Sequence, residues 1–214
     1  NDAYNPIYGD KHPGAFGRPM RESWAEIWDF LKPAFDQVTA TGEPLWFHDS
    51  LLPLSRRGEP EECWFDYSYS PVRDEDGRCL GMVSIAVEKT QHVVLGRRMK
   101  TCDLPMDVMQ DGRLGSLAAA LRERLAQNPM DAAGARFRRI DAATGEPGEP
   151  FWTLGSAFDP GETRWVRVTL SNRRGEPVAR LDLLPDALVP PESHAAFVTM
   201  LSDRLHRVMH QAEL

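Results

Sequence analysis

The chain has 214 residues, enough for one large domain or for two of about 100 residues each. Hydrophobic residues make up 42% of it and charged residues 27%, which excludes a disordered chain and a disulfide-stapled miniprotein. The net charge of −7 argues against a nucleic-acid-binding surface, because such a surface normally needs a basic patch against phosphate.

The cysteines and the hydropathy of the sequence indicate in which cellular compartment the protein is expected. Cys63, Cys79 and Cys102 lack the close pairing of a zinc site or of a redox Cys-x-x-Cys motif. A reducing, cytoplasmic environment is therefore the simplest expectation. The sequence contains no run of about 18 apolar residues and no signal-peptide pattern, so we expect no membrane segment in this chain.

The first half predicts a helix followed by three strands. After a stretch rich in Pro and Gly, apolar residues at i, i+3 and i+4 spacing predict one helix over 21–41, kinked at Pro33 and ended by Gly42. Asp76-Gly77 marks a hairpin turn between the last two strands. The last strand is nearly all apolar, which favours a central place in its sheet. The predicted strands are 44–54, 62–72 and 79–87.

The second half predicts a similar unit with more strands. A short helix over 91–99 precedes it, and Pro105 and Gly112 prevent one long continuous helix. We therefore predict an α+β fold with two domains, each a mainly antiparallel sheet flanked by helices. The predicted elements are a helix over 114–127, strands over 135–141, 151–158, 163–171 and 178–184, and a closing helix over 192–212.

Three segments of the first half follow one another in a distinctive order. They are Asn1-Asp2-Ala3-Tyr4, a Ser-Pro-containing hairpin over 69–78, and Glu88-Lys89-Thr90. Together they resemble a PAS sensor domain, in which an Asp/Glu-x-Thr element couples the last strand to the outgoing signalling helix. The resemblance implies that Glu88 and Thr90 are signal-coupling residues.

The resemblance extends to the neighbouring segments. Gly9-Asp10-Lys11-His12-Pro13 and Trp24-x-x-Ile27-Trp28 resemble the PAS domain that opens many bacterial sensor histidine kinases and precedes a GAF domain. The stretch 117–131 and the helix after Pro191 resemble the entry and closing helices of a GAF domain. The resemblance implies a PAS-like domain over 1–90, a helical linker over 91–112 and a degenerate GAF-like domain over 113–214.

The PAS family also implies a partner. In that family two strands precede the Asn-Asp-Ala-Tyr segment and pair with the last strand, whereas this sequence begins at that segment. The strand 79–87 would then have an unpaired, apolar edge. We expect a second copy of the chain to cover this edge in a homodimer.

No catalytic, metal or cofactor motif emerges. His206 and His210 share one helix face, but the intervening Glu and a third ligand of a zinc site are missing. Kinase phosphoacceptor and glycine-rich nucleotide motifs are absent too. The sequence also lacks the residues that bind chromophores or haem. A flavin would need an Asn-Cys-Arg-Phe segment, a haem a His within 21–41, and a bilin a Cys within 113–214. We expect neither catalysis, metal nor cofactor.

Aromatic residues are the remaining candidates for a ligand site. They could line the space between the PAS-like sheet and its helices, where tyrosine hydroxyls could orient a small organic ligand. A filled core explains the same residues equally well. The candidates are Tyr4, Trp28, Phe35, Phe65, Tyr67 and Tyr69.

The sequence thus predicts a non-catalytic sensory and dimerisation region of a bacterial signal-transduction protein. Its output domain would be a histidine kinase of a two-component system or a similar domain. Two alternatives stay open: a dimerisation scaffold that binds no ligand, and a small redox enzyme that uses its cysteines on a PAS- or GAF-like fold.

Overall fold

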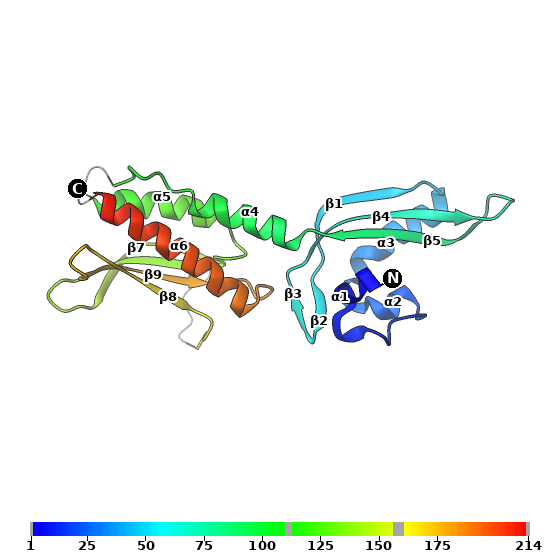
Figure 1. The fold of residues 1–214 in the computed structure, drawn as a ribbon, viewed down its shortest axis with the longest axis horizontal. Helices are drawn as coiled ribbons and strands as arrows, with labels where there is room; N and C mark the ends of the chain where they lie inside the picture. Colours follow the sequence, from blue (N-terminus) through cyan, green and yellow to red (C-terminus); the bar gives the residue numbers. More distant parts are fainter. Residues whose placement is uncertain (1, 110–112, 156–160, 213–214) are drawn as a thin grey trace. The chain divides into compact units, whose positions relative to one another are not determined.

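The computed structural model describes residues 2–109, 113–155 and 161–212, and the chain divides into two units, Asn1–Val94 and Leu95–Leu214 (Figure 1). Each unit encloses a hydrophobic core of its own. The division falls within helix α4 (Thr90–Cys102), most of which lies in the stretch predicted as a linker, 91–112. Residues 110–112 of that stretch lie outside the described residues.

Short helices build the first part of unit one. The predicted single helix over 21–41 is wrong, because the backbone breaks at Trp24, where φ is −123° and ψ is 40°. The Trp24 side chain is buried and stacks on Tyr8 with 4.8 Å between ring centroids, so tertiary packing overrides helix propensity here. The helices are η1 (Asp2–Tyr4), α1 (Asn5–Tyr8), η2 (Gly9–Lys11), α2 (Met20–Ser23), η3 (Ala25–Ile27) and α3 (Trp28–Thr41).

Helix α3 continues through Pro33 and ends where the sequence predicts. Gly42 follows it with φ of 69°, the left-handed conformation that glycine adopts without strain, and its N–H donates to Val38 O. The side chains of Leu31, Ala34 and Val38 form its buried face.

An antiparallel sheet with the order β1-β4-β5 lies beside α3 in the first unit. Its strands are β1 (Leu45–Leu51), β4 (Trp64–Arg73) and β5 (Cys79–Glu88), and β2 (Leu54–Arg57) and β3 (Glu59–Glu61) form a separate ribbon. The predicted turn between β4 and β5 is confirmed, since Gly77 has φ of 81° and the Arg78 N–H donates to Asp74 Oδ1 at 2.8 Å.

Strand β5 is an edge strand among the described residues, so the prediction of a central position is wrong and that of an unpaired edge is confirmed. Its apolar run divides between two faces. Met82 and Ala86 pack on the core, whereas Val83, Ile85 and Val87 alternate with them and are exposed. A continuous apolar run therefore does not by itself indicate a strand covered on both sides.

The second unit is a four-stranded antiparallel sheet with helices on one face. Its strands are ordered β7-β6-β9-β8, and Figure 1 shows α5 and α6 over the same side of them. Phe137, Leu181, Phe197 and Leu205 are fully buried between these layers. The elements are α5 (Leu114–Ala126), β6 (Gly134–Ile140), β7 (Pro147–Gly155), β8 (Val166–Ser171), β9 (Pro177–Leu184) and α6 (Pro191–Ala212).

The predicted α+β class with two antiparallel sheets is confirmed. Across the described residues, none of the helices combines the length and the apolar content that a membrane crossing requires.

Candidate functional site

The six aromatic residues predicted to line a ligand site do meet in one cluster, the core of unit one. Phe35 connects two of them, with its ring centroid 5.3 Å from that of Trp28 and 4.6 Å from that of Tyr69. Tyr67 and Tyr69 are 5.4 Å apart. Tyr4 and Phe65 line the same small cavity as these two tyrosines.

That cavity has a volume of about 30 Å³, space for about one water molecule. Its lining is mostly apolar, with Ile27, Leu31 and Leu54 among the contributing side chains. Trp28 and Phe35 pack against the surrounding cluster and do not belong to the lining. In the described conformation the side chains themselves fill the core.

Burial determines the protonation state of the tyrosine hydroxyls in this core. It raises the pKa of Tyr4, Tyr67 and Tyr69 above the ordinary value, so all three are neutral at physiological pH. A hydrogen bond with Ser50 partly offsets the effect at Tyr67. Neutral hydroxyls in this core could donate to or accept from a small polar group.

Two aromatic contacts in this cluster were missed from the sequence. Phe47 on β1 stacks on Tyr67 at 4.6 Å, and Tyr8 stacks on Trp24. The apolar run Leu45-Trp46-Phe47 within the first predicted strand was a usable signal for Phe47. The contact between Tyr8 and Trp24 joins two separate segments, and sequence periodicity does not predict contacts of that kind.

The second candidate is the junction at which β5 becomes α4. Thr90 Oγ1 donates to Glu88 Oε1 at 2.7 Å and accepts the backbone N–H of Trp64 at 3.0 Å. The Lys89 N–H donates to the Trp64 carbonyl at 2.7 Å. Both backbone groups of Trp64 therefore hold the junction: the N–H holds Thr90, the first residue of α4, and the carbonyl holds Lys89.

Arg56 of β2 anchors Glu88 from the other side. Its Nη2 lies 2.6 Å from Glu88 Oε1 and 2.8 Å from Cys63 Sγ, and its Nε lies 3.6 Å from Glu61 Oε1. Burial lowers the pKa of Arg56, but the hydrogen bonds and charges of Glu88 and Cys63 together outweigh this and raise it above the ordinary value, so the guanidinium stays charged. The role of Arg56 could not be predicted from local sequence patterns, because its partner Glu88 lies 32 residues away.

Lys89 ties the same junction to β1. Its Nζ lies 2.8 Å from Asp49 Oδ1 and 3.2 Å from Asp66 Oδ2. Asp49 sits in the irregular stretch of β1 with φ of 45°, and its N–H donates to Asp66 Oδ1 at 2.8 Å. In the Glu-Lys-Thr element, Glu88 therefore contacts β2, Lys89 contacts β1 and β4, and Thr90 contacts β4.

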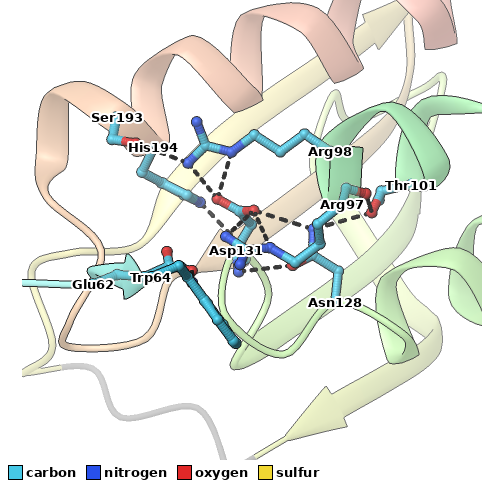
Figure 2. Close-up of polar contacts among 9 residues, drawn as sticks. All are labelled: Glu62, Trp64, Arg97, Arg98, Thr101, Asn128, Asp131, Ser193 and His194. Carbon is cyan, nitrogen blue, oxygen red and sulfur yellow. Dashed lines mark hydrogen bonds and ion pairs between the residues drawn. The ribbon is translucent and has the colours of Figure 1, made fainter. Parts of the chain in front are cut away.

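A buried polar cluster in unit two is the third candidate (Figure 2). Asp131, in the loop after α5, is fully buried, and its Oδ1 accepts from Arg98 Nε at 3.0 Å and Nη2 at 2.6 Å. Arg97 donates to Oδ2 from Nε at 3.2 Å and from Nη2 at 3.1 Å. Both arginines belong to α4, so one carboxylate holds the C-terminal half of that helix on unit two.

The first turn of α6 joins the same cluster. Arg98 Nη2 donates to Ser193 Oγ at 3.0 Å, and His194 Nε2 donates to the backbone carbonyl of Asp131 at 3.0 Å. Asn128 Nδ2 donates to Thr101 Oγ1 at 3.0 Å. The Asp131 cluster, meaning Arg97, Arg98, Thr101, Asn128, Asp131, Ser193 and His194, thus links α4, the loop after α5 and α6.

The electrostatics of the cluster follow from burial and charge. Burial alone would raise the pKa of Asp131, but the hydrogen bond from Arg98 and the charge of Arg97 hold it below the ordinary range. Burial lowers the pKa of His194, which the Asp131 carbonyl and carboxylate only partly offset. The cluster therefore contains an ionised aspartate and a neutral histidine at physiological pH.

Comparison with known proteins identifies the first unit. Residues 1–94 match a family model described as PAS fold, and the first unit accordingly has a PAS fold. No curated protein sequence matches this chain.

Two solved structures share a limited likeness. A crystal structure of a C-terminal part of PelD from Pseudomonas aeruginosa PAO1 aligns with a TM-score of 0.36 and 18% identity, over 57% of this chain and 49% of that one. An apo form of a PelD fragment from Pseudomonas aeruginosa PA14 aligns with a TM-score of 0.30 and 19% identity, over 54% and 48%. The chain thus spans about half the length of the solved structures it matches.

Proposed function

We propose that this chain is a non-catalytic sensory and regulatory segment of a bacterial signal-transduction protein. The observation that carries the proposal is the junction of Thr90 with Glu88 and Trp64, because it makes the first residue of α4 dependent on the sheet of the PAS fold. A change in the aromatic core would shift β4 and β5, alter these bonds, and change the populations of α4 conformations.

The output belongs to the same proposal. We propose that α4 and a GAF-like second unit pass the change to a histidine kinase or similar output domain in the cytoplasm, as part of a two-component system. Arg97 and Arg98 on α4 support this route, since the helix that starts at Thr90 is held two turns later by Asp131.

A small organic ligand in the aromatic core is the proposed signal, without a metal or prosthetic group. Because the described cavity holds about one water molecule, such a ligand would have to displace side chains, as Met20 or Tyr4 at the cavity wall could allow. A thermal-shift screen of metabolites and aromatic acids on the whole chain tests this. The absence of any stabilising compound favours a filled core and a signal of another kind.

Homodimerisation is proposed through β5. An antiparallel strand pair is self-complementary about a two-fold axis, so a single exposed edge suffices to join two copies. The strand is ten residues long and carries no charged residue from Cys79 to Val87, and Val83, Ile85 and Val87 are exposed on one face. Such an edge lacks the charges and prolines that normally discourage pairing.

The two alternative functions, a redox enzyme and a dimerisation scaffold, require different features of the chain. A redox enzyme needs a reactive thiolate, yet burial raises the pKa of Cys63 and raises that of Cys102 to about 11. Neither thiol is therefore activated at neutral pH. A scaffold needs the dimer edge but not the Thr90 junction.

The experiment that separates sensor from scaffold uses the full-length protein. Glu88→Gln and Thr90→Val are assayed for signal-dependent output, with histidine autophosphorylation from ATP as the first readout. The sensor proposal expects both variants to uncouple output from signal while the protein stays dimeric. Unchanged control of output in both variants would refute it.

A further inference from the structure

Four arginines gather on the open face of the sheet in unit two. Phe137, Leu181 and Val168 point into the core beneath the helices, so the residues that alternate with them point away from it. These outward residues include Arg136 and Arg138 on β6, Arg180 on β9 and Arg167 on β8, which we call the arginine face.

Strand register places the arginine face around one acid. Arg136 and Arg167 both lie opposite Asp182, the central residue of the group. Asp182 Oδ2 lies 3.1 Å from Arg136 Nη2 and 2.8 Å from Arg138 Nη2, and Oδ1 lies 2.7 Å from Arg180 Nε. Arg167 Nε is 3.7 Å from Oδ1, so four guanidinium groups share one carboxylate.

Stabilisation of the sheet does not explain why these arginines are grouped together. Arg138 lies directly opposite Arg180, and like charges at facing positions of neighbouring strands destabilise a sheet. The Nε of Arg138 is buried and has no hydrogen-bond partner among the described residues. This excess of positive charge also stands out in a chain whose net charge is −7.

A hollow opens beside two of the four arginines, Arg136 and Arg138. It has a volume of about 630 Å³, within the range of small-molecule sites, and Arg136, Arg138, Glu149 and Thr153 are among its lining residues. The Trp165 ring lies beside one of these arginines, with the Arg136 guanidinium 5.9 Å from a ring centroid. Gly134 leaves room for that ring, since a Cβ there would lie 2.9 Å from it.

We propose that the arginine face binds a small soluble organic phosphate that carries at least two negative charges. Guanidinium groups match phosphate oxygens by forked hydrogen bonds, and a tetrahedral phosphate can bridge arginines from neighbouring strands. Asp182 holds the guanidinium groups in place, and the three remaining positive charges exceed what Glu149 at the rim can neutralise. The site lies in unit two and does not depend on the function proposed for the Thr90 junction.

Calorimetric titration of the whole chain with inorganic pyrophosphate tests the proposal, with citrate at equal ionic strength as a carboxylate comparison. We expect saturable binding of pyrophosphate and at least tenfold weaker binding of citrate. Arg138→Gln and Arg180→Gln should each weaken pyrophosphate about tenfold, since each removes one charged hydrogen-bond donor. Arg122→Gln is the matched control, because Arg122 is exposed on α5, over the opposite face, and should change affinity less than twofold.

A further variant guards against misfolding. Arg138→Lys keeps the charge and should recover part of the affinity that Arg138→Gln loses. Absence of binding at millimolar pyrophosphate, equal binding of citrate, or equal weakening by Arg122→Gln would overturn the proposal. So would binding to phosphatidylglycerol vesicles without a response to pyrophosphate.

Discussion

Thr90 and Glu88 are joined by a hydrogen bond of 2.7 Å across the residue at which the last strand of the PAS fold becomes a helix. The hydroxyl also accepts from Trp64, and the carboxylate also binds Arg56. Each of the two side chains therefore has one partner within the junction and one on another strand. The start of α4 is thereby connected to two other strands of unit one, β2 and β4.

Thr90→Val should loosen the start of α4. The variant keeps the shape of the side chain but leaves the Trp64 N–H without its acceptor, a loss of about 1–3 kcal/mol of stability in unit one. Hydrogen exchange at the Trp64 amide should accelerate by about tenfold or more, since 1.4 kcal/mol is a factor of ten. Thr39→Val is the control, because its exposed hydroxyl bonds only within α3 and its loss should cost below about 0.5 kcal/mol. Equal exchange rates in the two variants would contradict the role assigned to Thr90.

Local patterns predicted much of the fold, because the physics involved is local. The positive φ of Gly42 and Gly77 and the alternation along β4 follow from single residues and their neighbours. The break at Trp24 and the edge position of β5 depend instead on distant packing partners. The site residues divide in the same way: Glu88 and Thr90 belong to a short motif, whereas Arg98 meets Asp131 and Ser193 across 33 and 95 residues.

Asp131→Asn should be among the most destabilising single changes in unit two. It removes the charge that compensates Arg97 and Arg98, and Arg98 is itself buried, so the cost should be about 3–5 kcal/mol. Urea unfolding of the whole chain, followed by hydrogen exchange in α4 and α6, measures it. Glu162→Gln is the control, because its ion pair with Arg164 lies at the surface, where water screens the charges, and its loss should cost far less than that of Asp131. Comparable losses in both variants would show that the Asp131 cluster contributes little.

Acid should weaken the same cluster. The pKa of Asp131 is depressed in the folded chain, so its contribution to stability is complete above the unfolded value of about 3.9 and is lost as pH falls through the lower, folded value. The difference in unfolding free energy between the wild type and Asp131→Asn should therefore shrink below about pH 4. A difference that stays constant from neutral pH to pH 3 or so would contradict an ionised Asp131 in the folded state.

His194 should make the stability of the chain depend on pH closer to neutrality than Asp131 does. Burial depresses its pKa, so below the unfolded value of about 6.5 the unfolded chain binds a proton that the folded chain does not. The wild type should thus lose stability as pH falls below about 6.5, by at most about 1.4 kcal/mol per pH unit from this group. Asp131 and Arg98 are the charged groups that face the ring, and both keep their charge over that range.

His194→Gln isolates this effect. The glutamine amide can still donate to the Asp131 carbonyl but does not titrate, so the slope of stability between about pH 6.5 and 5 should become smaller. His92→Gln is the matched control, because His92 is exposed on α4, and it should leave the slope unchanged. Parallel pH profiles for the wild type and His194→Gln would rule out the buried, neutral histidine.

Ile85→Lys tests the proposed dimer. Ile85 is 66% exposed on the outer face of β5, so a lysine there should change the stability of the monomer by less than about 0.5 kcal/mol. In a dimer paired along β5, the lysines would replace apolar cross-strand contacts and add two positive charges to one interface, which should weaken association at least tenfold, about 1.4 kcal/mol. Phe30→Lys is the control, because Phe30 is 67% exposed on α3, away from the sheet edge. Sedimentation equilibrium gives the dissociation constants; a wild-type chain that stays monomeric at high micromolar concentration, or equal weakening by both substitutions, would exclude the β5 edge as the interface.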